Sequence, residues 1–145
     1  MLITEYKVES RYPDCDRMGV VHHAVYPVWY EAARIDWLEK AGFPFALSQE
    51  KHVNPAMVEL NIRYLAAVGY PEEVTITVTP ELLAPKKLAL TYRLTKADGT
   101  EAGTARSFHI WTGPDNKSYH LQDKLPEIYA ALSAAVSDSV GEQSE

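Results

Sequence analysis

The sequence contains a single cysteine, Cys15, among its 145 residues. A lone thiol cannot form an internal disulfide and is typical of reducing compartments, so we expect a cytoplasmic protein. No apolar run approaches the roughly 20 residues that a transmembrane helix needs. The first seven residues also lack the basic and apolar regions of a secretory signal. Neither a membrane span nor export is therefore expected.

Positive charge is also scarce. The chain has 14 Lys and Arg against 20 Asp and Glu, which gives a net charge of −6. Proteins that bind nucleic acid need a basic face for the phosphates, so we expect no such partner. Hydrophobic residues make up 46% of the chain, enough for one folded domain over residues 1–136, followed by a polar tail over residues 137–145.

The sequence does contain a clear order of strand-like and helix-like segments. Alternating residues predict a strand over residues 4–11, and apolar spacings of three and four predict a long helix from about residue 24 to residue 41. We expect Trp29, Ala32 and Ile35 of this helix to be buried against strands. An irregular stretch (45–54), four further strands (56–65, 73–83, 87–96 and 101–111) and a short helix (126–136) complete the expected order.

The connections between the last four predicted strands are short, which favours antiparallel neighbours. The long helix is apolar over most of its circumference, so the sheet is expected to wrap around it. This is an α+β fold in the hotdog arrangement. One helix leaves much of the sheet uncovered, which predicts a homodimer or homotetramer. Glu31 and Arg34, three positions apart on the helix, are expected to form an ion pair of little energetic weight.

The chemistry is concentrated in residues 11–23, directly ahead of the long helix. This stretch holds a tyrosine, two carboxylates, a thiol and two imidazoles, next to a helix N-terminus that favours developing negative charge. The alternative is that Asp14 and Asp16 are only turn or capping residues. A calcium loop is excluded because its twelfth position is Val25 instead of a bidentate glutamate. Zinc-type spacing is absent as well, so we expect no metal and no cofactor.

These residues resemble the 4-hydroxybenzoyl-CoA thioesterase-like branch of the hotdog superfamily, and within it the acyl-CoA thioesterases associated with the bacterial Tol–Pal system. The specific motif is confined to residues 12–34, whereas the order of elements matches over nearly the whole chain. The marks of the resemblance are Tyr12-Pro13-Asp14-Cys15-Asp16, Gly19-Val20-Val21-His22-His23, Tyr26, Trp29-Tyr30, Glu31, Arg34 and the later segment Asn61–Ala67.

The resemblance implies a thioesterase that converts an acyl-CoA and water into a carboxylic acid and free CoA. Asp16 would be the catalytic carboxylate, acting as nucleophile or general base, and Tyr12 and His23 would accompany it. Lys86 and Lys87, in the turn between the third and fourth strands, are candidates for contacts with the CoA phosphates. Two alternatives stay open: a hotdog hydratase or dehydratase of acyl thioesters, and a non-catalytic acyl-CoA-binding protein.

Overall fold

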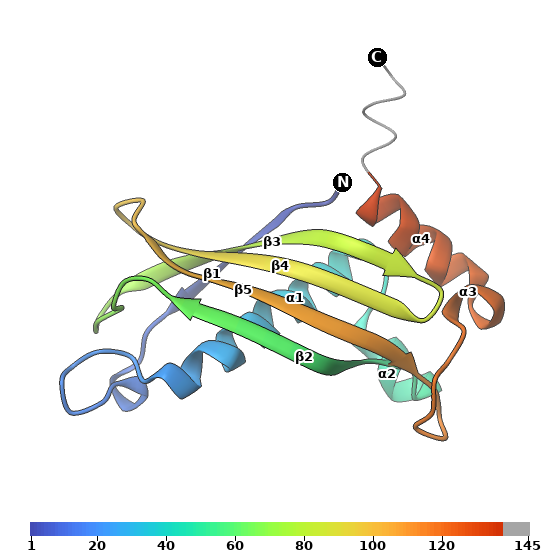
Figure 1. Ribbon diagram of the computed structural model, residues 1–145, viewed down its shortest axis with the longest axis horizontal. Coiled ribbons are helices and arrows are strands. Elements are labelled where there is room, and N and C mark those ends of the chain that lie inside the picture. Colours follow the sequence, from blue (N-terminus) through green and yellow to red (C-terminus); the bar gives the residue numbers. More distant parts are fainter. Residues whose placement is uncertain (138–145) are drawn as a thin grey trace, which may run out of the picture.

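The computed structural model describes residues 1–137, so the predicted tail beyond Ser137 lies outside the described residues. Within residues 1–137, five strands and four α-helices follow the order β1, α1, α2, β2, β3, β4, β5, α3, α4 (Figure 1). Their bounds are β1 Thr4–Glu9, α1 Tyr26–Ala41, α2 Phe45–Lys51, β2 Asn54–Tyr64, β3 Glu73–Ala84, β4 Lys87–Lys96, β5 Glu101–Thr112, α3 Leu121–Lys124 and α4 Pro126–Val136.

The strands form one antiparallel sheet in the order β1-β3-β4-β5-β2. Short turns join β3 to β4 and β4 to β5, as the sequence predicts. In the second turn Gly99 adopts a φ of +89°, and the Lys96 N–H donates to the Thr100 carbonyl at 2.8 Å. Each predicted strand ends within two residues of the observed one, because turn residues separate the strands in the sequence.

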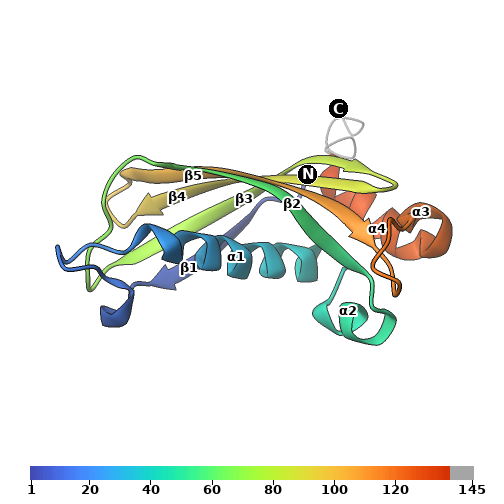
Figure 2. The same cartoon turned by 60° about the horizontal axis from the view of Figure 1, so that its bottom comes forward.

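Helix α1 lies along the concave face of the curved sheet (Figure 2). It begins at Tyr26, after a 3-10 turn over His23–Val25, and runs for about 24 Å. It ends at Ala41 and is capped by Gly42, whose φ is +103° and where a Cβ atom would approach Ala131 to 2.8 Å. The predicted hotdog arrangement, a sheet wrapped around one long helix, is confirmed.

The prediction of which face of α1 is buried was only partly right. Trp29 is 6% exposed, but Ala32 is half-buried and Ile35 is 40% exposed. The sheet instead covers the aromatic face of Tyr30 and Trp37, both fully buried. At 100° per residue Ile35 lies about 140° around the helix from Tyr30, so the two cannot face the sheet together. The larger aromatic side chains take the buried face because they remove more apolar surface from water.

The prediction of an irregular stretch over residues 45–54 was wrong, because α2 occupies most of it. Its first N–H, that of Phe45, donates to the Glu39 side chain at 3.1 Å, and the helix ends at Lys51, before His52, whose φ is +55°. A helix of only seven residues leaves little periodicity in the sequence.

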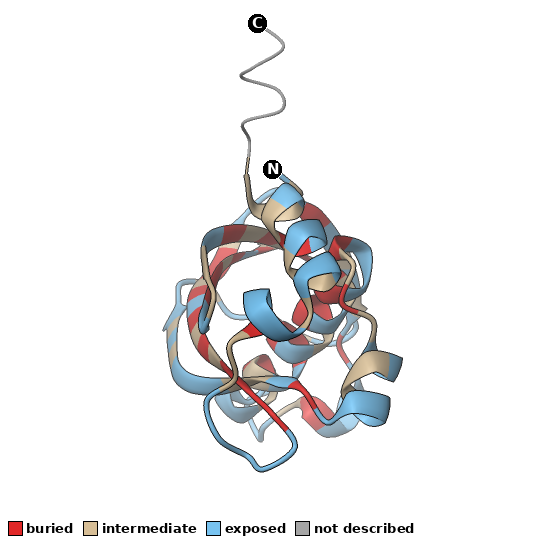
Figure 3. Cartoon of the chain, turned by 90° about the vertical axis from the view of Figure 1, so that its right-hand side faces the viewer, coloured by how far each residue is buried: buried red, intermediate tan, exposed pale blue. Residues whose placement is uncertain are grey.

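Helix α4 confirms the predicted C-terminal helix and covers the end of the sheet near the N-terminus of the chain. Leu132 is fully buried, and the Leu2 N–H donates to the Ala135 carbonyl at 2.7 Å. Viewed from the end that carries α3 and α4, the sheet curves around the interior (Figure 3). No helix within residues 1–137 has the length and apolar character needed to cross a membrane.

Candidate active site

The chain between β1 and α1 forms a tight loop at the N-terminal end of α1 (Figure 2). Cys15 and Val21 form an antiparallel bridge at the base of the loop, and the Asp16 N–H donates to the Val20 carbonyl at 2.8 Å. Gly19 adopts a φ of +81°, a conformation that favours glycine. The loop therefore returns the chain on itself and delivers residues 16–23 to the start of the helix.

Asp16 is exposed near the tip of this loop and uses only one carboxylate oxygen to hold it. Its Oδ1 accepts hydrogen bonds from the Met18 N–H at 2.8 Å and the Val20 N–H at 3.4 Å. Its Oδ2 accepts no hydrogen bond from residues 1–137. The turn role and the catalytic role that the sequence left as alternatives are thus compatible, since the loop orients the carboxylate and leaves one oxygen available.

Asp14, two residues earlier, lies in a different environment. It is 7% exposed, and its carboxylate accepts from the Arg11 backbone N–H at 3.1 Å and from the Arg11 guanidinium at 3.1 Å. The Asp14 carboxylate raises the pKa of Arg11 through this hydrogen bond and its charge. Asp14 is consequently a buried capping residue of the 3-10 turn Tyr12–Asp14.

His23 begins the 3-10 turn that leads into α1. Its exposed ring stacks on that of His22 with the centroids 4.2 Å apart, while His22 Nδ1 accepts from the Ala24 N–H at 3.0 Å and caps the turn. The His23 backbone N–H makes no hydrogen bond to residues 1–137. A backbone donor at this position, just ahead of a helix, is suited to a developing oxyanion.

Asp16 and His23 line the same cleft, which has a volume of about 360 Å³. The opposite wall comes from the segment that follows β2. The lining residues are Asp16, Val20, Val21, His23, Tyr26, Tyr64, Leu65, Ala66 and Ala67. The cleft therefore combines one carboxylate, one imidazole and one unpaired backbone donor with mainly apolar and aromatic walls.

The aromatic wall of the cleft was not predicted. Tyr26 and Tyr64 pack edge to face at 4.8 Å, and the Tyr64 hydroxyl donates to the His23 carbonyl at 2.9 Å. Burial raises the pKa of Tyr26, and the neighbouring Tyr64 and Glu72 raise it further. Strand alternation from Ile62 indicates which face Tyr64 shares, but only the fold shows that this face meets the His23 turn.

Tyr12 lies beside Asp16 in a second, larger hollow of about 560 Å³ on the other side of the loop. It is 75% exposed, and its ring packs edge to face against Tyr70 at 5.8 Å. Its hydroxyl makes no hydrogen bond to residues 1–137. Asp16 therefore borders both hollows, with His23 in one and Tyr12 in the other.

Lys86 and Lys87 lie at the opposite end of the sheet from Asp16. Lys87 begins β4, whereas Lys96, at the far end of that strand, contacts the cleft wall at the Ala67 carbonyl. A strand of this length spans about 30 Å. Within one chain, these lysines therefore lie far from the thioester position that Asp16 would define, and their contact with CoA stays a prediction.

The residues of the motif do not form a metal centre among residues 1–137, where no group of three or more His, Cys, Asp or Glu side chains has suitable positions. The Cys15 thiol is half-buried and lies 3.8 Å from the Arg11 carbonyl.

A second polar cluster, missed from the sequence, is buried between α1 and the sheet. His109 Nδ1 lies 3.1 Å from the Pro55 carbonyl, which can only accept, so Nδ1 carries the proton. His109 Nε2 then accepts from the Ser107 hydroxyl at 2.8 Å, and Ser107 accepts from Tyr92 at 2.7 Å. Tyr92 in turn accepts from Arg34 at 3.2 Å. Arg34 is thus a buried donor as well as the predicted partner of Glu31, which lies 3.8 Å away.

Comparisons with known proteins show what the chain as a whole is similar to. The family model described as thioesterase-like superfamily matches residues 11–136. The Bacillus subtilis (strain 168) protein named "Putative acyl-CoA thioesterase YneP" is 27% identical over 136 residues, 93% of this chain and 99% of that protein. The structure of a DHNA-CoA thioesterase from Staphylococcus aureus has a TM-score of 0.90 at 26% identity, covering 100% of this chain and 97% of that one. The Thermus thermophilus protein TT1821 has a TM-score of 0.83 at 30% identity, covering 92% and 98%.

Proposed function

The chain belongs to the thioesterase-like superfamily, and from this premise we propose that it hydrolyses an acyl-CoA thioester to a carboxylic acid and free CoA. The observation that carries the proposal is that Asp16 and His23 line one cleft, where Asp16 Oδ2 and the His23 N–H are both without a partner among residues 1–137. A thiolate is a good leaving group, so one carboxylate and one oxyanion donor are sufficient chemistry.

In the general-base route, Asp16 removes a proton from a water molecule, and the water oxygen bonds to the thioester carbonyl carbon. The His23 N–H donates to the resulting oxyanion. The carbon–sulfur bond then breaks, and CoA leaves as a thiolate. Asp16 passes the proton that it took from water to this thiolate, which gives free CoA. In the nucleophilic route, Asp16 itself attacks the carbon, CoA thiolate leaves, and water hydrolyses the mixed anhydride.

The names of the relatives support thioester chemistry, since YneP is named as an acyl-CoA thioesterase and the Staphylococcus aureus protein as a DHNA-CoA thioesterase. The finer resemblance to the Tol–Pal-associated enzymes is the reason for proposing that Tyr12 and the His23 imidazole assist Asp16 in the reaction. It rests on residues 12–34 alone. We propose an acyl-CoA as the substrate without choosing the acyl group.

We further propose that the protein is a cytoplasmic homodimer in which two copies pair along β2. This strand is one of the two edges of the sheet, with one side unpaired within residues 1–137, and its Met57 and Val58 are 40% and 57% exposed. On α1, Val28 and Ile35 are 63% and 40% exposed. Antiparallel pairing of two β2 edges would bring the start of β2 in one copy beside the cleft of the other, and would cover these apolar side chains.

A thiol-release assay over short, long and aromatic acyl-CoAs tests the activity. We expect free CoA from at least one class, and release at least about 100-fold slower from the Asp16→Asn variant. Hydration of an enoyl-CoA without thiol release would support the hydratase alternative instead. Binding of acyl-CoA with no turnover, unaffected by Asp16→Asn, would support a binding protein.

Sedimentation equilibrium tests the dimer. We expect twice the 16.3 kDa chain mass for the wild type and the mass of a monomer for Val58→Asp.

A further inference from the structure

The cleft residues Leu65, Ala66 and Ala67 begin an irregular segment, residues 65–72, that connects β2 to β3. This segment also contacts the catalytic loop directly. The Val21 N–H donates to the Val68 carbonyl at 2.8 Å, and Val20 forms an isolated bridge with Gly69. Any displacement of the segment would therefore move Val20 and Val21.

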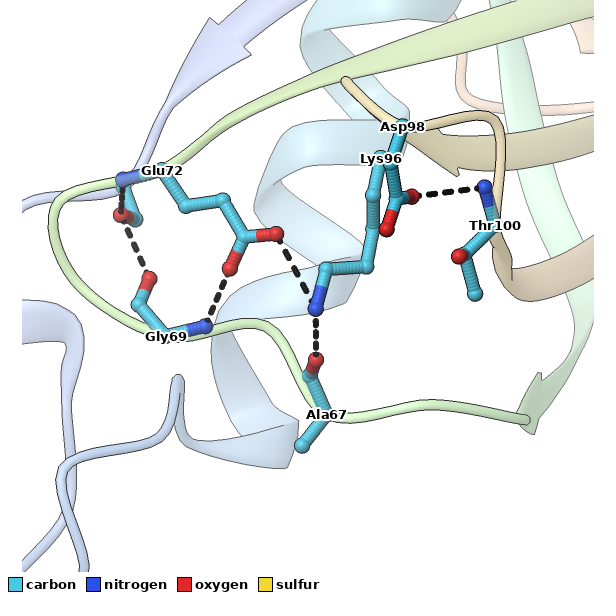
Figure 4. A network of polar contacts seen from close by, with 7 residues as sticks. Ala67, Gly69, Glu72, Lys96, Asp98 and Thr100 are labelled. Atoms are coloured by element: carbon cyan, nitrogen blue, oxygen red, sulfur yellow. Dashed lines mark hydrogen bonds and ion pairs between the residues drawn. The ribbon is translucent and has the colours of Figure 1, made fainter.

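Two charged side chains hold this segment in place. Lys96 Nζ donates to the Ala67 carbonyl at 2.9 Å and lies 3.1 Å from Glu72 Oε1 (Figure 4). Glu72 Oε2 accepts from the Gly69 N–H at 2.8 Å. The two side chains are only 23% and 22% exposed, so water screens this pair less than it screens surface pairs.

The same network reaches the end of β1. The Ser10 hydroxyl donates to the Gly69 carbonyl at 2.8 Å and accepts from the Glu72 N–H at 3.0 Å. Both backbone groups of Gly69 are thus occupied by polar side chains. The segment belongs to no strand, so these side-chain bonds add to the few backbone bonds that hold it, such as the one from the Ser10 N–H to the Glu72 carbonyl at 2.8 Å.

We propose that Lys96 and Glu72 are positioning residues of the thioesterase reaction. The proposal rests on the proposed function, because it assigns them the task of holding the cleft wall and the catalytic loop in register. The path of contacts is continuous. Lys96 and Glu72 fix Ala67 and Gly69, which flank Val68. Gly69 forms a bridge with Val20, and the Val68 carbonyl accepts from the Val21 N–H. Val20 in turn contacts Asp16 through both its N–H and its carbonyl.

The reaction requires the carboxylate to lie near one face of the carbonyl carbon while the oxyanion donor lies within hydrogen-bond distance of the carbonyl oxygen. A shift of about 1 Å in one of them costs up to 100-fold in rate in comparable cases. Loss of the clamp therefore lowers kcat more than it raises KM, because substrate binding uses the remaining walls of the cleft as well. A residue with only a structural role would lower stability without this kinetic split.

The test uses Lys96→Met, which keeps the aliphatic length and removes the charge. Arg93→Met is the matched control, because Arg93 lies on the same strand and its guanidinium pairs with Glu101 at 3.1 Å, away from the cleft. We expect kcat/KM to fall about tenfold in Lys96→Met, mainly through kcat, and to stay within twofold of wild type in Arg93→Met. Lys96→Arg should recover most of the loss. Equal losses in the two Met variants, or a wild-type value in Lys96→Met, would overturn the proposal.

Hydrogen exchange at the Val21 amide gives a second readout that does not depend on activity. We expect this amide to exchange about tenfold faster in Lys96→Met, because the Val68 carbonyl that it binds is released, and to be unchanged in Arg93→Met. Glu72→Gln, which keeps an acceptor for Gly69, provides a milder variant should Lys96→Met fail to fold, with the same direction of change. A wild-type protein that releases no CoA would refute the proposed function, whereas unchanged Val21 exchange in the folded variants would refute the clamp.

Discussion

The Asp16 loop and the buried chain of hydrogen bonds from Arg34 to His109 contain similar chemical groups. They differ in whether the polar atoms of these groups have hydrogen-bond partners. In the buried chain every polar atom named above has a partner, and Ser107 and His109 are 0% and 2% exposed. In the loop, Asp16 and His23 are exposed and keep an oxygen and an N–H that bind nothing within residues 1–137. A serine beside a histidine is therefore not a sign of catalysis here. Unused hydrogen-bonding capacity in an open cleft is the better criterion, since substrate must supply the missing partners.

The largest expected effect is on Asp16. Replacing it with Asn keeps the turn but removes the base or nucleophile, so hydrolysis should fall at least about 100-fold while the melting temperature changes little. Asp98→Asn is the matched control, because Asp98 Oδ1 accepts from the Thr100 N–H at 2.9 Å in a similar exposed turn that borders no described cleft. Thiol release and thermal unfolding of both variants measure the difference. An Asp16→Asn variant that releases thiol at the wild-type rate would contradict the catalytic role of Asp16.

The buried chain should instead control stability through pH. Burial, with a smaller contribution from the charge of Arg34, lowers the pKa of His109 from 6.5 to about 4. The unfolded chain therefore binds a proton at this histidine between pH 6.5 and about 4, where the folded protein does not. The free energy of unfolding should fall by roughly 3 kcal/mol as the pH drops through that window.

Denaturant unfolding at pH 7 and pH 4 measures this loss, with His109→Gln as the variant that cannot gain the charge. We expect a smaller loss of stability between the two pH values in His109→Gln than in the wild type. Its kcat/KM at pH 7 should remain within about threefold of wild type, because His109 does not border the cleft. Identical pH dependence in the two proteins would contradict the assignment of a neutral, buried His109.

These two regions also differ in how far the sequence reveals them. The loop is a contiguous motif ahead of a helix, so its candidate residues could be named from the sequence, and their roles stay predictions. The strand ends were predicted to within two residues, since Gly99 and its neighbours mark the turns. The buried chain joins α1 to strands more than 50 residues away, and Arg34 and Tyr92 are 58 residues apart. No local pattern in one sequence indicates such contacts.

The same reason explains the other omissions. Lys96 and Ala67 are 29 residues apart in the sequence. They meet only because the last residues of β4 and of β2 lie at the same end of the sheet. The buried face of α1 was misjudged because two apolar stripes were present, and local periodicity cannot say which one the sheet covers. The exposed stripe, with Val28 and Ile35, is the one that the proposed dimer would use.

A smaller effect is expected for His23. The His23→Ala variant loses the imidazole but keeps the backbone N–H, so we expect about a tenfold fall in kcat if the ring only orients water beside that donor. His22→Ala is the control, because it removes the cap on the Ala24 N–H and should cost stability of about 1 kcal/mol with less effect on rate. A loss in His23→Ala as large as that of Asp16→Asn would make the imidazole an obligatory acid or base.

The smallest effect concerns Lys86 and Lys87, which are exposed and about 30 Å along β4 from the cleft of their own chain. In a dimer they could still reach the CoA held by the other copy. Exposed lysines contribute modest, salt-dependent attraction to phosphate. Replacing both with Ala should therefore raise KM for the acyl-CoA about threefold at low ionic strength, leave kcat unchanged, and have no effect in high salt. The same acyl thioester of pantetheine, which lacks the nucleotide phosphates, is the control and should react equally well with both proteins. An unchanged KM for the acyl-CoA at low salt would exclude these lysines from the CoA site.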